Sequence, residues 1–320
     1  MADPFQNKFF NPQVVRGYNR LLIGETQLDK LAFSYYADLF YNMGCRRRKR
    51  SKILDLGSGP GYLGIELASR IKEGSIHLLD ISPDMIEKAR QNVGQRFSGN
   101  KNIKFDYTVD DAANLLRHVR KNSLDLIIAR HVIQIPKDPE EILKQAYETL
   151  RPNGKLIFTL IGYNTYNFSE NGNSLFENEF FSKLTRAAFE VLPSYLSKLP
   201  KDAIHYLREE GIVNRQDLSL KIEALYPKYD KNTILDKLDK AGVPLSKVNN
   251  LILPETHTVA FKQGYSLVLG SVPIPGLWNV FPLFDEVTRY EMVHEIYEKA
   301  FPGNKHIPIQ THDPVFIVTK

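Results

Sequence analysis

Apolar and polar positions follow two different periods along the middle of the chain. Short apolar runs, each bounded by polar or glycine-rich segments, predict strands. Segments with helical spacing separate these runs. The predicted strands cover residues 52–56, 75–80, 102–109, 124–130 and 154–161.

Two of the intervening segments carry helix start signals. Ser82 precedes Pro83 and Asp138 precedes Pro139, so each pair places a capping residue before a proline at the first helical position. Nearly continuous apolar strands that alternate with helices predict a parallel sheet covered on both faces. The fold class predicted is therefore α/β.

The pattern changes after about residue 165. The following segment is mostly helical in character and rich in aromatic residues, and strand patterns return only at 255–261 and 313–320. We interpret the helical segment as an insertion in an α/β domain. The predicted regions are an N-terminal helical cap (1–50), a core (51–164), a helical lid (165–250) and a return to the core sheet (251–320).

Composition narrows the class of protein. The chain has 320 residues, of which 42% are hydrophobic and 25% charged, as in ordinary globular proteins. It has no apolar run of the length that crosses a bilayer and no signal peptide, so we expect no membrane span. The single cysteine, Cys45, excludes an internal disulfide and a Cys-based zinc site. We expect a cytoplasmic setting and infer no metal.

The net charge of +5 is a mild excess, and nucleic acid is therefore not the expected partner. Part of the excess lies in the run "RRRKR", residues 46–50. A solvated turn before the first strand is one interpretation of this run. A patch that contacts phosphates is the other.

The segment "DLGSGPGYLG" joins the first strand to a helix through three closely spaced glycines. Glycines allow close backbone approach, and the helix start offers free N–H groups to a polar ligand. A phosphate-binding P-loop would need Gly-Lys-Ser/Thr, and a dinucleotide fingerprint would need G-x-G-x-x-G. The spacing here is G-x-G-x-G, and Asp55 just before it favours a ligand with an ammonium group.

Carboxylates also follow the next two strands. Asp80 closes the second strand, where it can accept both hydroxyls of a ribose. Asp111 can accept from an adenine amine, and the Ala112 N–H can donate to a ring nitrogen. A cationic amino acid joined to an adenosine, without phosphate, satisfies all of these groups.

With these motifs in place, the chain resembles class I S-adenosylmethionine-dependent methyltransferases. The resemblance rests on "DLGSGPG", "LLDISPDMIEKAR", "DDAANL" and the stretch from 124 to 160, and it covers roughly residues 50–162. It implies a Rossmann-like seven-stranded sheet of order 3-2-1-4-5-7-6 with strand seven antiparallel. It also implies S-adenosylmethionine as the cofactor and a lid over the substrate pocket.

The resemblance assigns roles to residues of this chain. Asp55 and the loop Gly57, Ser58, Gly59 and Gly61 would hold the methionine end, and Asp80 the ribose. Ile81 and Met85 would pack on the adenine, and Asp111 and Ala112 would bind its edge. The backbone of Ala129 and Arg130 would meet the ammonium group, and Tyr18 in the cap could cover the cofactor.

Two histidines are candidates for a general base, which an oxygen acceptor often needs. His131 follows the fourth strand, and an imidazole titrates near neutral pH. His257 lies on the predicted sixth strand. Each could equally be a packing residue, and His131 could be part of the cofactor pocket.

The aromatic lid favours an apolar small molecule, such as a natural product, as the methyl acceptor. The resemblance is to small-molecule O-methyltransferases of secondary metabolism in particular. Alternatives are an RNA or protein methyltransferase that uses the run 46–50, a protein that binds the cofactor without methyl transfer, and a dinucleotide oxidoreductase.

Overall fold

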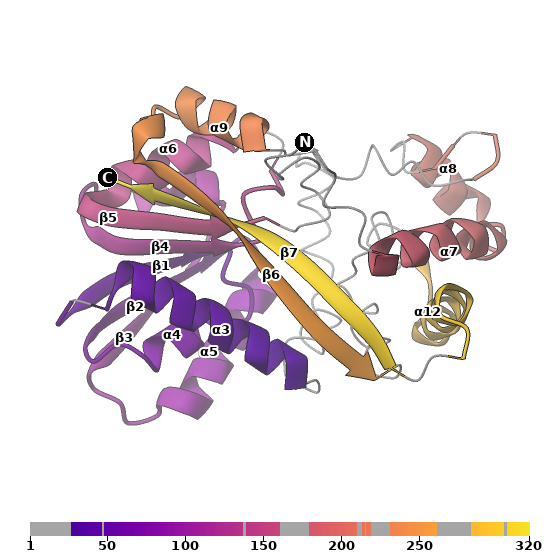
Figure 1. Cartoon of the computed structure of the whole chain (residues 1–320), viewed down its shortest axis with the longest axis horizontal. Helices are drawn as coiled ribbons and strands as arrows, with labels where there is room; N and C mark the ends of the chain where they lie inside the picture. The colour runs from indigo at the N-terminus through magenta and orange to yellow at the C-terminus, as the bar shows by residue number, and fades with distance from the viewer. Residues whose placement is uncertain are drawn as a thin grey trace.

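The sheet of the protein has the predicted topology. The computed structural model describes residues 27–46, 48–136, 139–160, 179–209, 213–214, 216–218, 231–260, 283–303 and 306–320. Seven strands lie in the order β3-β2-β1-β4-β5-β7-β6, and β7 runs antiparallel to both of its neighbours (Figure 1). The strands are β1 (Ser51–Leu56), β2 (Gly74–Asp80), β3 (Ile103–Val109), β4 (Leu124–Arg130), β5 (Leu150–Thr159), β6 (Val248–Ala260) and β7 (His306–Thr319).

Two hydrophobic clusters cover the two faces of the sheet. One face packs against α3 (Gln27–Gly44), α4 (Tyr62–Ala68) and α5 (Pro83–Phe97). The other packs against η2 (Ala112–Arg117), α6 (Glu140–Thr149) and α9 (Lys231–Lys240), and a short turn of 3-10 helix, η5 (Leu245–Lys247), follows α9. Because both faces are covered, β4 is buried along nearly its whole length, as the apolar run predicts.

The helix starts agree in part with the sequence signals. Ser82 caps α5, since its hydroxyl accepts from the Met85 N–H at 3.4 Å, and Pro83 occupies the first turn. The other start differs slightly. Pro139 predicts a helix that begins at residue 139, whereas α6 begins at Glu140. Asp138, the predicted cap of α6, lies outside the described residues.

The last two strands are longer than predicted. They pair from Val248 opposite Val318 to Ala260 opposite His306, and so extend as a two-stranded ribbon beyond β5. Pro254 and Pro308 interrupt the strand pattern in the sequence, yet prolines are compatible with the open edge of a ribbon.

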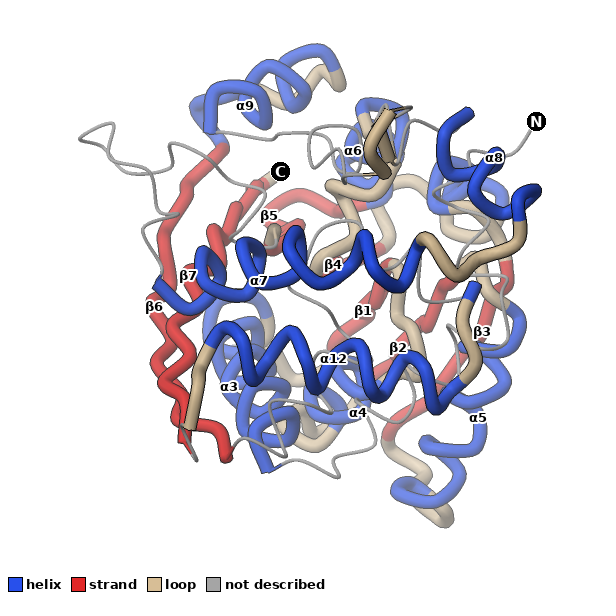
Figure 2. Tube along the Cα trace, turned by 90° about the vertical axis from the view of Figure 1, so that its right-hand side faces the viewer, coloured by secondary structure: helices blue, strands red, loops and turns tan. Residues whose placement is uncertain are grey.

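Three helices lie on the side towards which the parallel strands point: α7 (Glu179–Leu196), α8 (Lys201–Glu209) and α12 (Glu286–Ala300). Figure 2 shows α7 and α12 running side by side in front of the sheet. Lys299 pairs with Glu190 at 2.7 Å, and the Tyr195 hydroxyl donates to Glu295 at 3.0 Å. The sequence patterns had not indicated α12.

The helices of the predicted lid, 165–250, lie in two separate parts of the molecule. Its helices α7 and α8 lie at the carboxyl end of the sheet, whereas α9 packs on α6, where Lys237 pairs with Glu140 at 2.7 Å. The domain boundaries remain predictions. In the part of the chain that the structure describes, no helix is both long and apolar enough to cross a membrane.

Candidate active site

The three glycines of the loop after β1 all have left-handed backbone conformations, with φ of 66° at Gly57, 52° at Gly59 and 81° at Gly61. A β-carbon at Gly57 would lie 2.3 Å from the Val132 side chain, and one at Gly61 would lie 3.1 Å from Ala89. A β-carbon at Gly59 would meet no atom within 4 Å. The loop therefore packs tightly at its ends and leaves open space at its middle.

Asp80 ties this loop to the end of β2. Its carboxylate accepts the Gly59 N–H at 2.8 Å and the Ser82 N–H at 2.9 Å, one on each oxygen. Burial raises the pKa of Asp80, and the N–H groups of Ser82, Gly59 and Ile81 oppose that rise. The carboxylate is thus held by backbone groups, with lone pairs left for a ligand.

A cavity at the carboxyl end of the sheet collects most of the predicted cofactor residues. Those in its wall are Gly57, Gly59, Asp80, Ile81, Met85, Asp111, Ala112 and Arg130, together with His131. Ser58, Gly61 and Ala129 belong to the same loop and strand but lie outside the wall. The Ser58 N–H instead joins the loop to Leu79, whose carbonyl accepts it at 2.9 Å.

Asp55 lies behind the loop. Its side chain is 2% exposed, accepts the Gly64 N–H at 2.9 Å and is not part of the cavity wall. Burial raises its pKa to about 7, and the charge of Asp80 adds to the rise. Asp55 therefore anchors the first turn of α4 directly, and its charge would act on a ligand from behind the loop.

The adenine motif after β3 is held by a network that sequence reasoning missed. One oxygen of Asp110 accepts the Asp111 N–H at 2.7 Å and the Asn114 amide at 2.8 Å, and the other meets His118 Nε2 at 2.6 Å. These bonds lower the pKa of Asp110 to about 2, with His118 the largest cause. Asp111 itself accepts the Ala113 N–H at 2.9 Å and so caps η2.

Arg130 and His131 close the cavity at the end of β4. The Arg130 guanidinium carbon lies 5.1 Å from the centre of the Phe33 ring and 4.9 Å from that of Tyr36. Its Nε is buried without a hydrogen-bond partner among the described residues. His131 has a left-handed φ of 58°, and its N–H donates to the Thr159 carbonyl at 3.1 Å.

The other two predicted residues are Tyr18 and His257. Tyr18 lies outside the described residues. The backbone of His257 pairs opposite Ile309, six residues along β6 from Leu251, which is level with the end of β5. At about 3.3 Å per residue, His257 lies ~20 Å further along the ribbon.

Five wall residues were not predicted, and all of them are apolar: Leu79, Val132, Ile135, Pro136 and Ile142. Most of them follow β4 in the sequence. An apolar residue after a buried strand is normally interpreted as part of the hydrophobic core, so these residues did not stand out as ligand contacts. A usable signal existed, because the carboxyl ends of parallel strands meet at one edge and segments that follow them border the ligand.

Comparison with known proteins identifies the family. The model of the methyltransferase-domain family matches residues 47–233, which is more than half of the chain. The chain is 32% identical over 115 residues to malonyl-[acyl-carrier protein] O-methyltransferase of Halalkalibacterium halodurans, covering 36% of this chain and 40% of that protein. It is 31% identical over 113 residues to arsenite methyltransferase of Aquipseudomonas alcaligenes, covering 34% and 32%. These matches therefore span well under half of each relative's length.

Solved structures share the fold. Phosphoethanolamine N-methyltransferase 2 of Haemonchus contortus, solved with S-adenosyl-L-methionine, matches with a TM-score of 0.53 and 14% identity, covering all of this chain and 60% of that one. The sheet order and the antiparallel seventh strand complete the agreement. The chain belongs to the methyltransferase-domain family, with the class I fold of enzymes whose cofactor is S-adenosylmethionine.

Proposed function

We propose that the protein transfers a methyl group from S-adenosylmethionine to an oxygen of a small, largely apolar metabolite. The observation that carries this proposal is the composition of one cavity wall. Two carboxylates, a glycine loop and a single guanidinium line it together with apolar side chains, among the residues that the structure describes. This is the set of groups that a zwitterionic amino acid joined to an adenosine requires.

Each part of that cofactor has a candidate partner among the described residues. Asp80 would accept the ribose hydroxyls, and Ile81 and Met85 would pack on the adenine. Asp111 and Ala112 would bind the adenine edge. When bound, the cofactor supplies a methyl group activated by its sulfonium charge.

The methionine end would lie between the loop and Arg130. The Gly59 position leaves open space above the loop, so a ligand can approach the backbone closely. The Arg130 guanidinium, held by two aromatic rings, would bind the carboxylate as a planar pair of donors. The Arg130 backbone remains the predicted partner of the ammonium group.

The electrostatics support a cationic ligand. Asp55 and Asp80 are buried, and neither is paired with a basic side chain among the described residues. Buried carboxylates without a counter-charge favour a positive ligand, because it stabilises their ionised forms. A sulfonium and an ammonium group would both supply that charge.

Oxygen as the acceptor atom rests on His131. The relatives are named for methylation on oxygen, of arsenite and on nitrogen, so family membership leaves the atom open. His131 lines the cavity and could take the proton of an acceptor hydroxyl as the methyl group is transferred. Val132, Ile135 and Ile142 give the acceptor side an apolar wall.

The alternative of an RNA or protein substrate held by residues 46–50 finds no support in the arrangement. That run precedes β1, whereas the cavity lies beyond the other end of the same strand. The six residues of β1 separate the two by roughly 17–20 Å. The run therefore does not border the cavity.

Two measurements test the proposal in order. Thermal unfolding with S-adenosylhomocysteine should raise the Tm, while NAD should leave it unchanged, and the reverse result would refute the choice of cofactor. Incubation with S-adenosylmethionine and a panel of hydroxylated, apolar natural products should then release S-adenosylhomocysteine. A Tm shift without turnover on oxygen, nitrogen or thiol acceptors would support a cofactor-binding protein that does not transfer methyl groups.

A further inference from the structure

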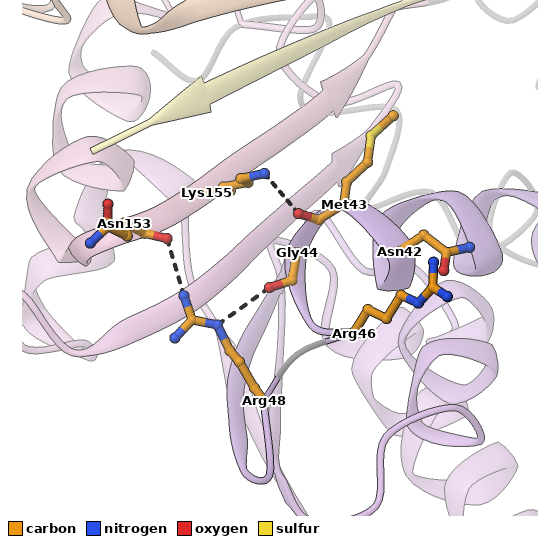
Figure 3. A pocket seen from close by; sticks show the side chains of 7 residues that line it. All are labelled: Asn42, Met43, Gly44, Arg46, Arg48, Asn153 and Lys155. Atoms are coloured by element: carbon orange, nitrogen blue, oxygen red, sulfur yellow. Dashed lines mark hydrogen bonds between the residues drawn. The ribbon is translucent and has the colours of Figure 1, made fainter.

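A second pocket lies at the opposite end of the sheet from the cofactor cavity. It has a volume of about 830 Å³, which falls in the range of small-molecule sites. Its wall comes from the end of α3, the turn that follows it and the start of β5 (Figure 3). The lining residues are Asn42, Met43, Gly44, Arg46, Arg48, Asn153 and Lys155.

The wall is basic, and its described residues include no carboxylate. Its charged members are Arg46, Arg48 and Lys155, and Asn42 and Asn153 add amide groups. Further lysines and arginines lie at this end of the sheet, but several of them pair with carboxylates: Arg50 with Glu73, Lys121 with Glu148 and Arg151 with Asp125.

The basic residues of the wall differ in how far the fold already uses them. Arg48 is fully engaged, since it pairs with Asp125 at 2.9 Å and donates to the carbonyls of Asn153 and Gly44. Lys155 donates to the Met43 carbonyl at 2.8 Å and pairs with no carboxylate among the described residues. Structural capping of α3 explains these bonds.

Capping does not explain the rest of the wall. The exposed Arg46 has no side-chain partner in the described part of the chain, and the Lys155 ammonium keeps two further donors. The only nearby buried carboxylate, Asp125 among the described residues, is already met by Arg48, Arg151 and the Lys52 N–H. The pocket therefore holds an excess of positive charge that no residue of the wall neutralises.

We propose that this pocket binds a small molecule that carries two or more phosphate groups. Arg46 and Lys155 provide charge-assisted donors from two sides of the wall, and the Asn42 amide beside Arg46 provides a neutral one (Figure 3). Lys155 is only partly exposed. A phosphate chain that enters the pocket can therefore reach its ammonium group more easily than a charged group on the flat surface of a partner protein can. The site is independent of the proposed methyl transfer.

Tripolyphosphate is the probe for this site. Isothermal titration at about 50 mM and about 200 mM salt should detect binding that weakens as salt rises. The titration is repeated with S-adenosylhomocysteine present, so that the cofactor cavity cannot contribute. The double variant Arg46→Gln/Lys155→Gln should lower the affinity by about tenfold or more, because it removes both charges while glutamine can still donate to Met43.

Arg50→Gln is the matched control. It removes a charge from the same basic run, but Arg50 lies outside the wall and pairs with Glu73 at 3.2 Å. Its affinity for tripolyphosphate should stay within about twofold of wild type. If a nucleotide is the source of the phosphates, ATP should bind as tightly as tripolyphosphate. If a long oligonucleotide binds as tightly as ATP, and Arg50→Gln weakens the binding of both, the site is an extended nucleic-acid surface and the pocket is refuted. No binding of tripolyphosphate by the wild type would also overturn the proposal.

Discussion

Buried carboxylates lie at both ends of the sheet, but the groups that contact them differ. At the amino end, Asp125 is 2% exposed and meets two guanidinium groups, from Arg48 and Arg151. At the carboxyl end, Asp55 and Asp80 meet backbone N–H groups. The buried carboxylate of the amino end is thus paired within the fold, whereas those of the carboxyl end keep negative charge open for a ligand that brings the positive partner.

The sharpest test of this contrast is His131→Asn. If the carboxyl end carries the chemistry, loss of the imidazole should lower kcat for a hydroxyl acceptor by about 10²- to 10⁴-fold. Asparagine tolerates the left-handed backbone at this position, so the fold should persist. Turnover of a hydroxyl acceptor measures the effect, and titration with S-adenosylhomocysteine should give an unchanged Kd.

Arg46→Gln is the matched change at the amino end. It should leave turnover within about twofold of wild type, because surface charges contribute little at a distance larger than the screening length. Equal turnover in His131→Asn and wild type would remove the general-base role. A strong loss in Arg46→Gln would instead show that the two ends are not separate in function.

The sequence was a good guide to the carboxyl end where the signals are local. Asp80 and Asp111 each follow a strand, and parallel topology brings strand ends together, so their meeting in one cavity could be predicted. The aromatic partners of Arg130 could not be, since Phe33 and Tyr36 lie about a hundred positions earlier and reach it only through the packing of α3. Contacts of that kind depend on the fold rather than on a pattern.

Arg130→Gln tests whether the guanidinium in the cavity wall binds the methionine end of the cofactor. The variant should raise the Kd for S-adenosylhomocysteine by about 10- to 100-fold, because a guanidinium–carboxylate pair is lost. The Kd for 5′-methylthioadenosine, which lacks the amino acid, should stay within about twofold. Equal losses for both ligands would indicate that Arg130 supports the cavity wall only through its packing on Phe33 and Tyr36.

The basic run shows why some residues need the structure. The residues at 46–50 read as one charged segment, yet Arg48 turns inward to Asp125 while Arg50 stays 74% exposed beside Glu73. A charge run predicts solvation or a patch but not which member is buried. The sequence also could not predict that Asp55 lies buried behind the loop, because its distance from the cavity depends on how α4 packs.

Asp55→Asn tests the cost of leaving that charge unpaired. The folded pKa of about 7 exceeds the ordinary value of 3.8, so the folded protein binds the proton more tightly than the unfolded chain. The contribution of Asp55 to the free energy of unfolding is therefore fully present below pH ~4 and is lost as the pH rises through 7. Between pH 5.5 and 8 the free energy of unfolding should fall by ~2 kcal/mol. Urea unfolding of the cofactor-free variant should lack this fall, because asparagine still accepts the Gly64 N–H and does not ionise.

Asp125→Asn is the corresponding change at the amino end. It should lower the free energy of unfolding at both pH values by about 3 kcal/mol, because Arg48 and Arg151 lose their shared partner. If Asp55→Asn and wild type show the same pH dependence, the open charge is not at Asp55. If Asp125→Asn costs nothing, the contrast between the two ends fails.

The smallest expected effect concerns the network that orders the adenine motif. His118→Gln removes the imidazole that meets Asp110, which holds the Asp111 N–H and the Asn114 amide. The Kd for S-adenosylhomocysteine should rise by about three- to fivefold, because the Asp110 carboxylate loses one of the groups that fix it. His77→Gln is the control, because His77 bonds Thr108 at 2.8 Å and, in the described part of the chain, makes no hydrogen bond to the motif's residues. No loss in His118→Gln, or an equal loss in His77→Gln, would reduce the network to general packing at the end of β3.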